Sequence, residues 1–177
     1  KVLAAFFALM SMLLFSATVN AKEPIKIGAI LAVTGPASFL GEPEKNTAIM
    51  LQEQINKAGG INGTPIEIII EDSKSDETQA VLAAKKLLEK DNVVAIIGPS
   101  TTGESMALVP IMNAAQTPLI SAAAGAPITQ PVDLRHWIFK TPQYDISAVE
   151  AIYDHMRKKG ITKSGIATIA TGFGDAG

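Results

Sequence analysis

The sequence predicts an open α/β sheet in which parallel strands alternate with helices. Short β-branched runs, such as residues 93–97, recur between helix-like segments along the whole chain. Residues 93–97 are apolar throughout, which is typical of a strand covered on both faces. Aromatic residues make up only 5% of the chain, and small apolar residues are abundant, as expected for a sheet covered by alanine-rich helices. The predicted fold class is therefore a doubly wound parallel α/β sheet.

The expected strands are bounded by turn residues and by helices. They are residues 25–33, 66–70, 93–97, 118–121, 137–140 and 165–169. A first helix is expected to have Pro43 in its first turn and to stop at Gly59-Gly60. Residues 37–41 before it are expected to be a loop. Because each strand is followed by a helical crossover, neighbouring strands are expected to run parallel.

Three further helices are expected after the second strand. The spacing Asp76-x-x-Gln79 predicts a capping box at the start of a helix that runs to about Lys90. A helix over residues 103–115 follows the third strand. The last helix, residues 145–159, is expected to end at Gly160.

Residues 1–21 differ in character from the rest of the chain. One lysine precedes an apolar run, and Val19-Asn20-Ala21 places small residues at the positions that matter for cleavage. This pattern predicts a cleavable secretory signal peptide. The alternative is a membrane anchor, since residues 2–19 are just long enough to span a bilayer. The polar residues near the cleavage-like end favour removal.

The composition narrows the compartment and the partners. The chain contains no cysteine, so it can form no disulfide and has no cysteine to carry a lipid after cleavage. A net charge of −2 gives no indication of a nucleic-acid partner. We therefore expect an unlipidated periplasmic protein that binds no nucleic acid and acts as a monomer.

The most informative stretch is residues 93–105. A buried strand ends at Gly98-Pro99, the hydroxyl residues Ser100, Thr101 and Thr102 follow, and a helix begins. The free backbone N–H groups of such a helix start attract a carboxylate or a phosphate. The glycine spacing resembles a nucleotide-binding loop, but Glu104 stands where that loop needs lysine and would repel a triphosphate. A small-anion site is one interpretation, and an ordinary strand–turn–helix corner is the other.

Two other loops leave strand ends at the same edge of the predicted sheet, where doubly wound folds bind ligands. Residues 34–41 offer the apolar Phe39, whose alternative role is to close the core. Residues 122–126 offer almost bare backbone. Together the three loops suit a small ligand with an anionic end and an apolar body.

The residues that catalysis or metal binding would need are scarce. His136 and His155 lie in different expected elements, and neither has a partner at the spacing of a metal site. Two acidic pairs, at residues 71–72 and 76–77, lack the ligand spacing of a calcium loop. We therefore expect no enzymatic activity, no metal and no cofactor.

Five segments in order resemble the branched-chain amino acid type of periplasmic binding protein, over essentially all of residues 22–177. They read IGAILAVTGP, INKAGGING, IIEDS, IIGPSTTG and PLISAAAG. The resemblance implies the two-lobe type I fold, in which two α/β lobes close over a ligand. It also implies a receptor that captures a small carboxylate-bearing solute and delivers it to the membrane permease of an ABC importer.

The resemblance also implies which residues contact the ligand. The carboxylate site falls on Thr102, with Thr101 beside it. The remaining implied ligand residues are Ala123, Ala124 and Gly125 in the loop after the fourth strand, Leu40 with Phe39 in the first loop, and Phe173 in the second lobe. Many amino-acid binders have threonine at the place of Gly125, so this chain lacks one hydroxyl there.

The resemblance finally implies a domain organisation. The first lobe covers residues 22–140, the first hinge crossing lies near Thr141-Pro142, and residues 141–177 begin the second lobe. Full-length relatives are about twice as long, so we expect these residues to be part of a longer protein. The same fold also serves as the ligand-sensing ectodomain of signalling receptors, which is the alternative function. An enzyme is a more distant alternative.

Overall fold

Five parallel strands form the sheet. The computed structural model describes residues 22–176, so the predicted signal peptide lies outside the described residues. The strands are β1 (Ile25–Leu31), β2 (Ile66–Asp72), β3 (Ile96–Ile97), β4 (Leu119–Ser121) and β5 (Ile138–Lys140). They are ordered β2-β1-β3-β4-β5, and every neighbouring pair is parallel. The order reverses beside β1, which confirms the doubly wound topology.

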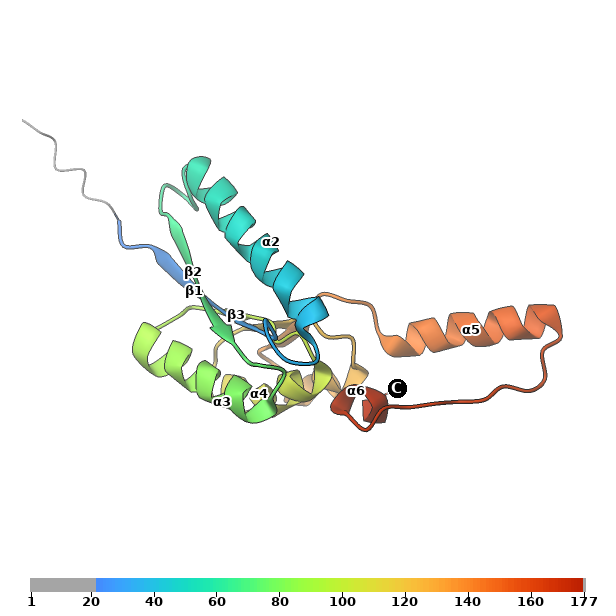
Figure 1. Ribbon diagram of the computed structural model, residues 1–177. Coiled ribbons are helices and arrows are strands. Elements are labelled where there is room, and N and C mark those ends of the chain that lie inside the picture. Colours follow the sequence, from blue (N-terminus) through green and yellow to red (C-terminus); the bar gives the residue numbers. More distant parts are fainter. Residues whose placement is uncertain (1–21, 177) are drawn as a thin grey trace, which may run out of the picture.

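Helices flank the sheet on both sides. They are α2 (Ser38–Lys57), α3 (Glu77–Lys86), the π-helix η1 (Leu87–Asp91), α4 (Thr102–Ala115), the short 3₁₀ turns η2 (Ala126–Ile128) and η3 (Val132–Leu134), α5 (Asp145–Lys159) and α6 (Gly172–Ala176). Figure 1 shows α2 on one side of the sheet and α3 and α4 on the other. Helix α5 projects away from the sheet, and the chain then returns so that α6 lies beside α4.

The main hydrophobic core lies between the sheet and the pair α3–α4. Strand residues Ile30, Ile96 and Leu119 are fully buried there. The α3 helix contributes small side chains, Ala80 and Ala84 among them, so it packs close to the strands. This predominance of alanine explains why few aromatic residues are needed to fill the core.

Helix α2 starts earlier than the position of Pro43 predicts. It begins at Ser38 and keeps Pro43 inside it, where the missing N–H removes one intrahelical hydrogen bond. The loop expected over residues 37–41 is therefore mostly the first helical turn. This turn approaches the end of β1 closely, because a Cβ atom on Gly41 would collide with the carbonyl oxygen of Ala32.

One of the two hydrogen bonds of the predicted capping box before α3 is confirmed, since the Asp76 carboxylate accepts from the backbone N–H of Gln79 at 2.8 Å.

The strand expected over residues 165–169 is wrong. That segment is exposed and pairs with none of the strands in residues 22–176. A parallel strand exists only through hydrogen bonds to a neighbour, so an apolar run without such a neighbour stays irregular.

The turn after β3 depends on Gly98. Its φ angle is +87°, a conformation that L-residues with side chains rarely adopt. A Cβ atom at this position would also collide with the carbonyl oxygen of Ile30 in β1. Gly98 therefore allows the loop after β3 to pass directly over the end of the neighbouring strand.

We expect Gly98→Ala to destabilise the protein by more than about 3 kcal/mol, because backbone strain and the collision with Ile30 add. Gly59→Ala is the matched control. Gly59 has a φ angle of +101° but no atom within 4 Å of an added Cβ, so it incurs the strain alone, about 1–3 kcal/mol. Urea unfolding of both variants measures the difference. Equal losses would contradict the collision.

Candidate functional site

The loop after β3 ends in a capping box at the start of α4. The hydroxyl of Thr101 accepts from the backbone N–H of Glu104 at 3.4 Å, and it donates to the Glu104 carboxylate at 2.6 Å. The same carboxylate accepts from the backbone N–H of Thr101 at 3.2 Å. Thr101, a predicted ligand residue, therefore has its polar groups engaged within the helix start. Its observed contacts stabilise the helix.

Thr102 differs from Thr101 in that its hydroxyl is free. The residue is 2% exposed, and within residues 22–176 the Oγ1 atom has no hydrogen-bond partner. It is the first residue of α4, where backbone N–H groups lack intrahelical partners. An uncompensated buried hydroxyl is costly, so such atoms in folded proteins usually face a ligand or a water molecule.

Gly125 lies directly against Thr102. A Cβ atom on Gly125 would be 2.9 Å from the Thr102 hydroxyl and still closer to its methyl group. The structure thus brings together the loops after β3 and β4, as the resemblance implied. A larger side chain at residue 125 would push against Thr102.

Two side chains hold the loop after β4 in place. Its first anchor is Ser121, whose hydroxyl shares a hydrogen bond of 2.7 Å with Ser105 on α4 and accepts from the backbone N–H of Ala123 at 3.1 Å. Its second anchor is Lys140, whose ammonium donates to the carbonyl of Ala124. The predicted ligand residues Ala123 and Ala124 therefore sit on a loop held in a defined conformation.

Ser100 links the third loop to the first strand and to α2. Its hydroxyl accepts from the backbone N–H of Ala32 at 3.0 Å and donates to the Glu44 carboxylate at 2.5 Å. Burial raises the pKa of the Glu44 carboxyl above its ordinary 4.5, and the nearby Glu104 raises it further, although the hydrogen bond from Ser100 lowers it. The start of α4 is thus tied to α2.

The first loop is held by a carboxylate at the end of β2. Asp72 accepts from the Thr34 hydroxyl at 2.7 Å and from the Thr34 backbone N–H at 3.1 Å. Phe39 and Leu40 follow on the first turn of α2 and are 74% and 38% exposed. Phe39 therefore does not close the core, which leaves its apolar ring available to a ligand.

Phe173 approaches the same region from the other end of the chain. Its neighbour Gly172 lies against α4, where an added Cβ would be 2.8 Å from the Cα of Gly103. Phe173 itself is 48% exposed. The structure thus places α6 beside the start of α4, next to the predicted carboxylate site (Figure 1).

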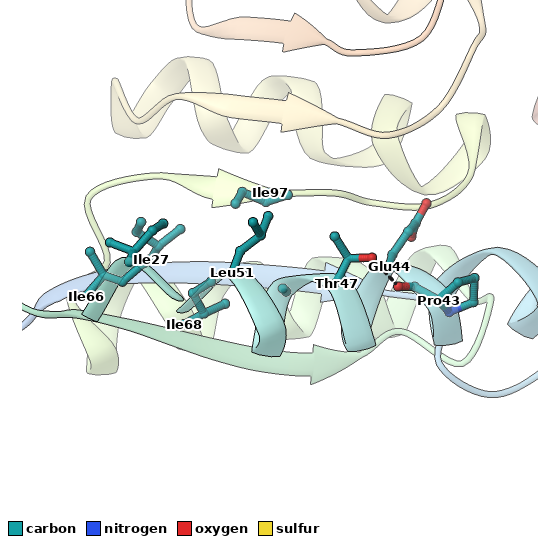
Figure 2. Close-up of a pocket in the computed structure, with 10 residues that line it drawn as sticks. Ile27, Pro43, Glu44, Thr47, Leu51, Ile66, Ile68 and Ile97 are labelled. Atoms are coloured by element: carbon teal, nitrogen blue, oxygen red, sulfur yellow. Dashed lines mark hydrogen bonds between the residues drawn. The ribbon is translucent and has the colours of Figure 1, made fainter. Parts of the chain in front are cut away.

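Two hollows lie away from Thr102. One is an apolar groove of about 440 Å³ between α2 and the sheet, lined by residues of α2 and by isoleucines from β1, β2 and β3, with Glu44 at one end (Figure 2). The other, of about 380 Å³, lies between η3 and β5 and includes Lys140 and Tyr144. Neither includes the loop over residues 122–126. The candidate site is therefore the strand-end edge, where a free hydroxyl meets a helix start.

Within the described part of the chain, no group of three histidine, aspartate or glutamate side chains could hold a metal ion. His136 packs edge-on against Trp137 at 5.9 Å between ring centroids. No helix in residues 22–176 is long and apolar enough to cross a membrane.

Sequence reasoning missed three features of this site. The capping role of Glu104 was detectable, because Thr101-x-x-Glu104 is itself a capping-box spacing. The link from Ser100 to Glu44 and the contact of Lys140 with Ala124 were not detectable, since they join residues far apart in sequence. What the site can do is present helix-start N–H groups and one free hydroxyl to an anion.

The chain is similar to known proteins over most of its length. A model of the family described as periplasmic binding protein matches residues 24–177. The "Leucine-, isoleucine-, valine-, threonine-, and alanine-binding protein" of Pseudomonas aeruginosa is 34% identical over 125 residues, which is 71% of this chain and 33% of that protein. "Leu/Ile/Val-binding protein homolog 3" of Brucella melitensis is 29% identical and covers 85% of this chain and 41% of its own length.

Solved structures are also similar, and two of them carry ligands. The branched-chain amino acid transporter substrate-binding protein LivJ from Streptococcus pneumoniae, in complex with isoleucine, has a TM-score of 0.65 at 31% identity, covering 70% of this chain and 35% of its own. A solute-binding protein of an ABC transporter from Rhodopseudomonas palustris, in complex with 3,4-dihydroxybenzoic acid, has a TM-score of 0.76 at 28% identity. The match covers 86% of this chain and 41% of that protein. The chain spans about a third to two fifths of the length of such relatives.

We expect Asp72→Asn to flatten the acid dependence of stability. Burial alone would raise the pKa of this carboxyl, but hydrogen bonds from Thr34 and from the backbone N–H of Lys74 hold it below its ordinary 3.8. The stabilisation from a lowered carboxyl pKa is present above about pH 3.8 and is lost as the pH falls through the lowered value.

Urea unfolding between pH 2 and pH 6 measures this effect. The stability difference between the wild type and Asp72→Asn should be largest at the upper end of this range and shrink at the lower end. Thr34→Val removes only the hydroxyl donor to Asp72. Its stability should therefore differ from the wild type in the same pH-dependent way, but by a smaller amount. A gap between the wild type and Asp72→Asn that does not change with pH would contradict the role of Asp72.

Proposed function

Since the chain belongs to the periplasmic binding protein family, in its branched-chain amino acid type, we propose that it is the solute-binding receptor of an ABC importer. It captures a small carboxylate at the start of α4. The observation that carries this proposal is the hydroxyl of Thr102, which is buried, has no partner in residues 22–176 and lies at a helix start.

Physical chemistry favours a carboxylate at this position. The capping box engages the Thr101 and Glu104 groups, which leaves the backbone N–H groups of Thr102 and Gly103 as donors at the first turn. The Thr102 hydroxyl adds a third donor beside them. A carboxylate accepts several hydrogen bonds at once, and the helix dipole favours its negative charge.

The apolar body of the ligand would lie among the exposed rings and chains around this point. Phe39 and Leu40 on α2 and Phe173 on α6 are exposed, and we propose that they contact this part of the ligand. We propose residues 22–140 as the first lobe and residues 141–177 as the beginning of the second, so that Phe173 covers the ligand when the lobes close. Closure removes water from the carboxylate and strengthens its hydrogen bonds.

Two classes of ligand are candidates. Relatives named for leucine, isoleucine and valine point to branched-chain amino acids, and the Rhodopseudomonas relative was solved with an aromatic acid. Gly125 lies directly against Thr102 and offers backbone atoms without a side-chain hydroxyl, which is compatible with either class. A thermal-shift screen of the full chain against amino acids and aromatic or aliphatic carboxylates separates them.

The remaining parts of the proposal follow from this role. The receptor is a binding protein rather than an enzyme, and it works as a monomer in the periplasm after removal of residues 1–21. Its macromolecular partner is the membrane permease of the importer, and it has no nucleic-acid partner. Intact mass of the exported protein checks the cleavage.

We expect Thr102→Val to weaken binding of the best ligand from the screen by about 1.5–3 kcal/mol, which is about tenfold to 150-fold in Kd. Valine keeps the shape and removes the hydroxyl. In the absence of ligand the variant should be at least as stable as the wild type, because a buried hydroxyl without a partner is lost. Calorimetry and urea unfolding measure the two effects separately.

Thr102→Ser is the matched control, since it keeps the hydroxyl and should retain most of the affinity. Weak binding together with lost stability in Thr102→Val would indicate a purely structural role for the hydroxyl. Unchanged affinity in Thr102→Val would overturn the assignment of the carboxylate site.

A further inference from the structure

Lys140 is the last residue of β5 and contacts chain segments on two sides. Its ammonium donates to the carbonyl of Ala124, in the loop after β4. It also donates to the carbonyl of Gln143 at 3.3 Å, in the segment that leads into α5. One side chain therefore bridges the candidate ligand loop and the beginning of the segment proposed as the second lobe.

Tyr144 makes a second connection between the same two segments. The Lys140 ammonium lies 4.2 Å from the centre of the Tyr144 ring, within the range of a cation–π contact. The Tyr144 hydroxyl shares a hydrogen bond of 3.0 Å with Thr129, which directly follows η2. Tyr144 is also the residue before the first turn of α5. Two side chains, not one, thus join α5 to the region around the loop.

The backbone adds a third connection. The N–H of Thr141 donates to the carbonyl of Ser121 at 3.0 Å, at the point where β4 ends. Ser121 is the residue that anchors the loop to α4 through Ser105. The end of β5, the loop after β4 and the start of α4 therefore form one continuous hydrogen-bonded unit.

The surroundings of Lys140 suit a fixed ammonium. Burial lowers the pKa of Lys140 below its ordinary 10.5, while Asp145 and Tyr144 act in the opposite direction. A partly buried ammonium needs acceptors, and the carbonyls of Ala124 and Gln143 supply them. A neutral side chain of similar length could not replace both hydrogen bonds.

We propose that Lys140 is a positioning residue that couples the order of the ligand loop, residues 122–126, to the placement of α5. This inference rests on the proposed function of that loop. When α5 moves relative to the sheet, the Gln143 carbonyl and the Tyr144 ring move with it, and the ammonium transmits that movement to Ala124. The loop keeps its observed shape only while residues 141–144, which lead into α5, stay in their observed position.

The test uses the full chain with four variants. Lys140→Met removes the charge and both hydrogen bonds, and Lys140→Arg keeps a cation that can reach the carbonyls. Tyr144→Leu removes the ring without changing Lys140. Lys158→Met, on the exposed surface of α5, is the matched control for loss of a lysine charge. Hydrogen exchange reports on the backbone amides, and calorimetry reports on affinity for the amino acids and aromatic acids of the screen.

In Lys140→Met, exchange should rise together in residues 122–126 and 141–147, by about tenfold, because a hydrogen bond to a charged group is lost at each segment. Tyr144→Leu should raise exchange in the same two segments to a smaller extent. Lys140→Arg and Lys158→Met should stay near the wild type. Affinity for the best ligand should fall about tenfold in Lys140→Met and recover in Lys140→Arg.

Exchange that rises in only one of the two segments, or equally in Lys140→Arg and Lys140→Met, would overturn the coupling. If Lys140→Met does not fold, Tyr144→Leu and Lys140→Arg decide the same question. Exchange is measured without ligand, so it tests the coupling even if no compound of the screen binds. Absence of any binding to the wild type would count against the proposed function alone.

Discussion

One hydrogen bond joins the parts of the candidate site: the backbone N–H of Ala32, at the end of β1, donates to the hydroxyl of Ser100. A buried N–H group must find an acceptor, and beyond the end of a strand the ladder no longer supplies one. Ser100 fills this need, and its hydroxyl in turn donates a hydrogen bond to the Glu44 carboxylate on α2. The loop that starts α4 is therefore fixed relative to both the first strand and the first helix. The position of Thr102 in space follows from this arrangement.

The hydrogen-bond donors at the start of α4 fall into two groups, those of Thr101 and those that follow it. Glu104 takes the Thr101 groups, and in doing so it places a buried carboxylate within the helix start itself. The ligand carboxylate that we propose for this site would therefore bind beside the Glu104 side chain. The raised pKa of Glu44, which Glu104 also influences, belongs to the same crowded region. Affinity at the proposed site would thus depend on hydrogen bonds placed at Thr102 and Gly103 more than on net positive charge.

The strand–helix alternation and the strand-end loops were predictable, because apolar periodicity and glycine positions are local properties of the sequence. The observed sheet and the contact between Thr102 and Gly125 agree with those predictions. The start of α2 was not predictable from Pro43, since it depends on the approach of Gly41 to Ala32. Residues 165–169 failed as a strand because strand formation needs a neighbour that the local pattern does not specify. The contacts of Lys140 and Glu44 are long-range and leave no local signal.

The central claim is that a ligand carboxylate binds at the start of α4. The most direct measurement is a titration of the ¹⁵N-labelled chain with the best ligand from the screen, followed by NMR of the backbone amides. We expect the largest shifts at Thr102 and Gly103, with smaller shifts in residues 122–126. Shifts concentrated instead at Leu51 and Ile68, in the apolar groove between α2 and the sheet, would contradict it.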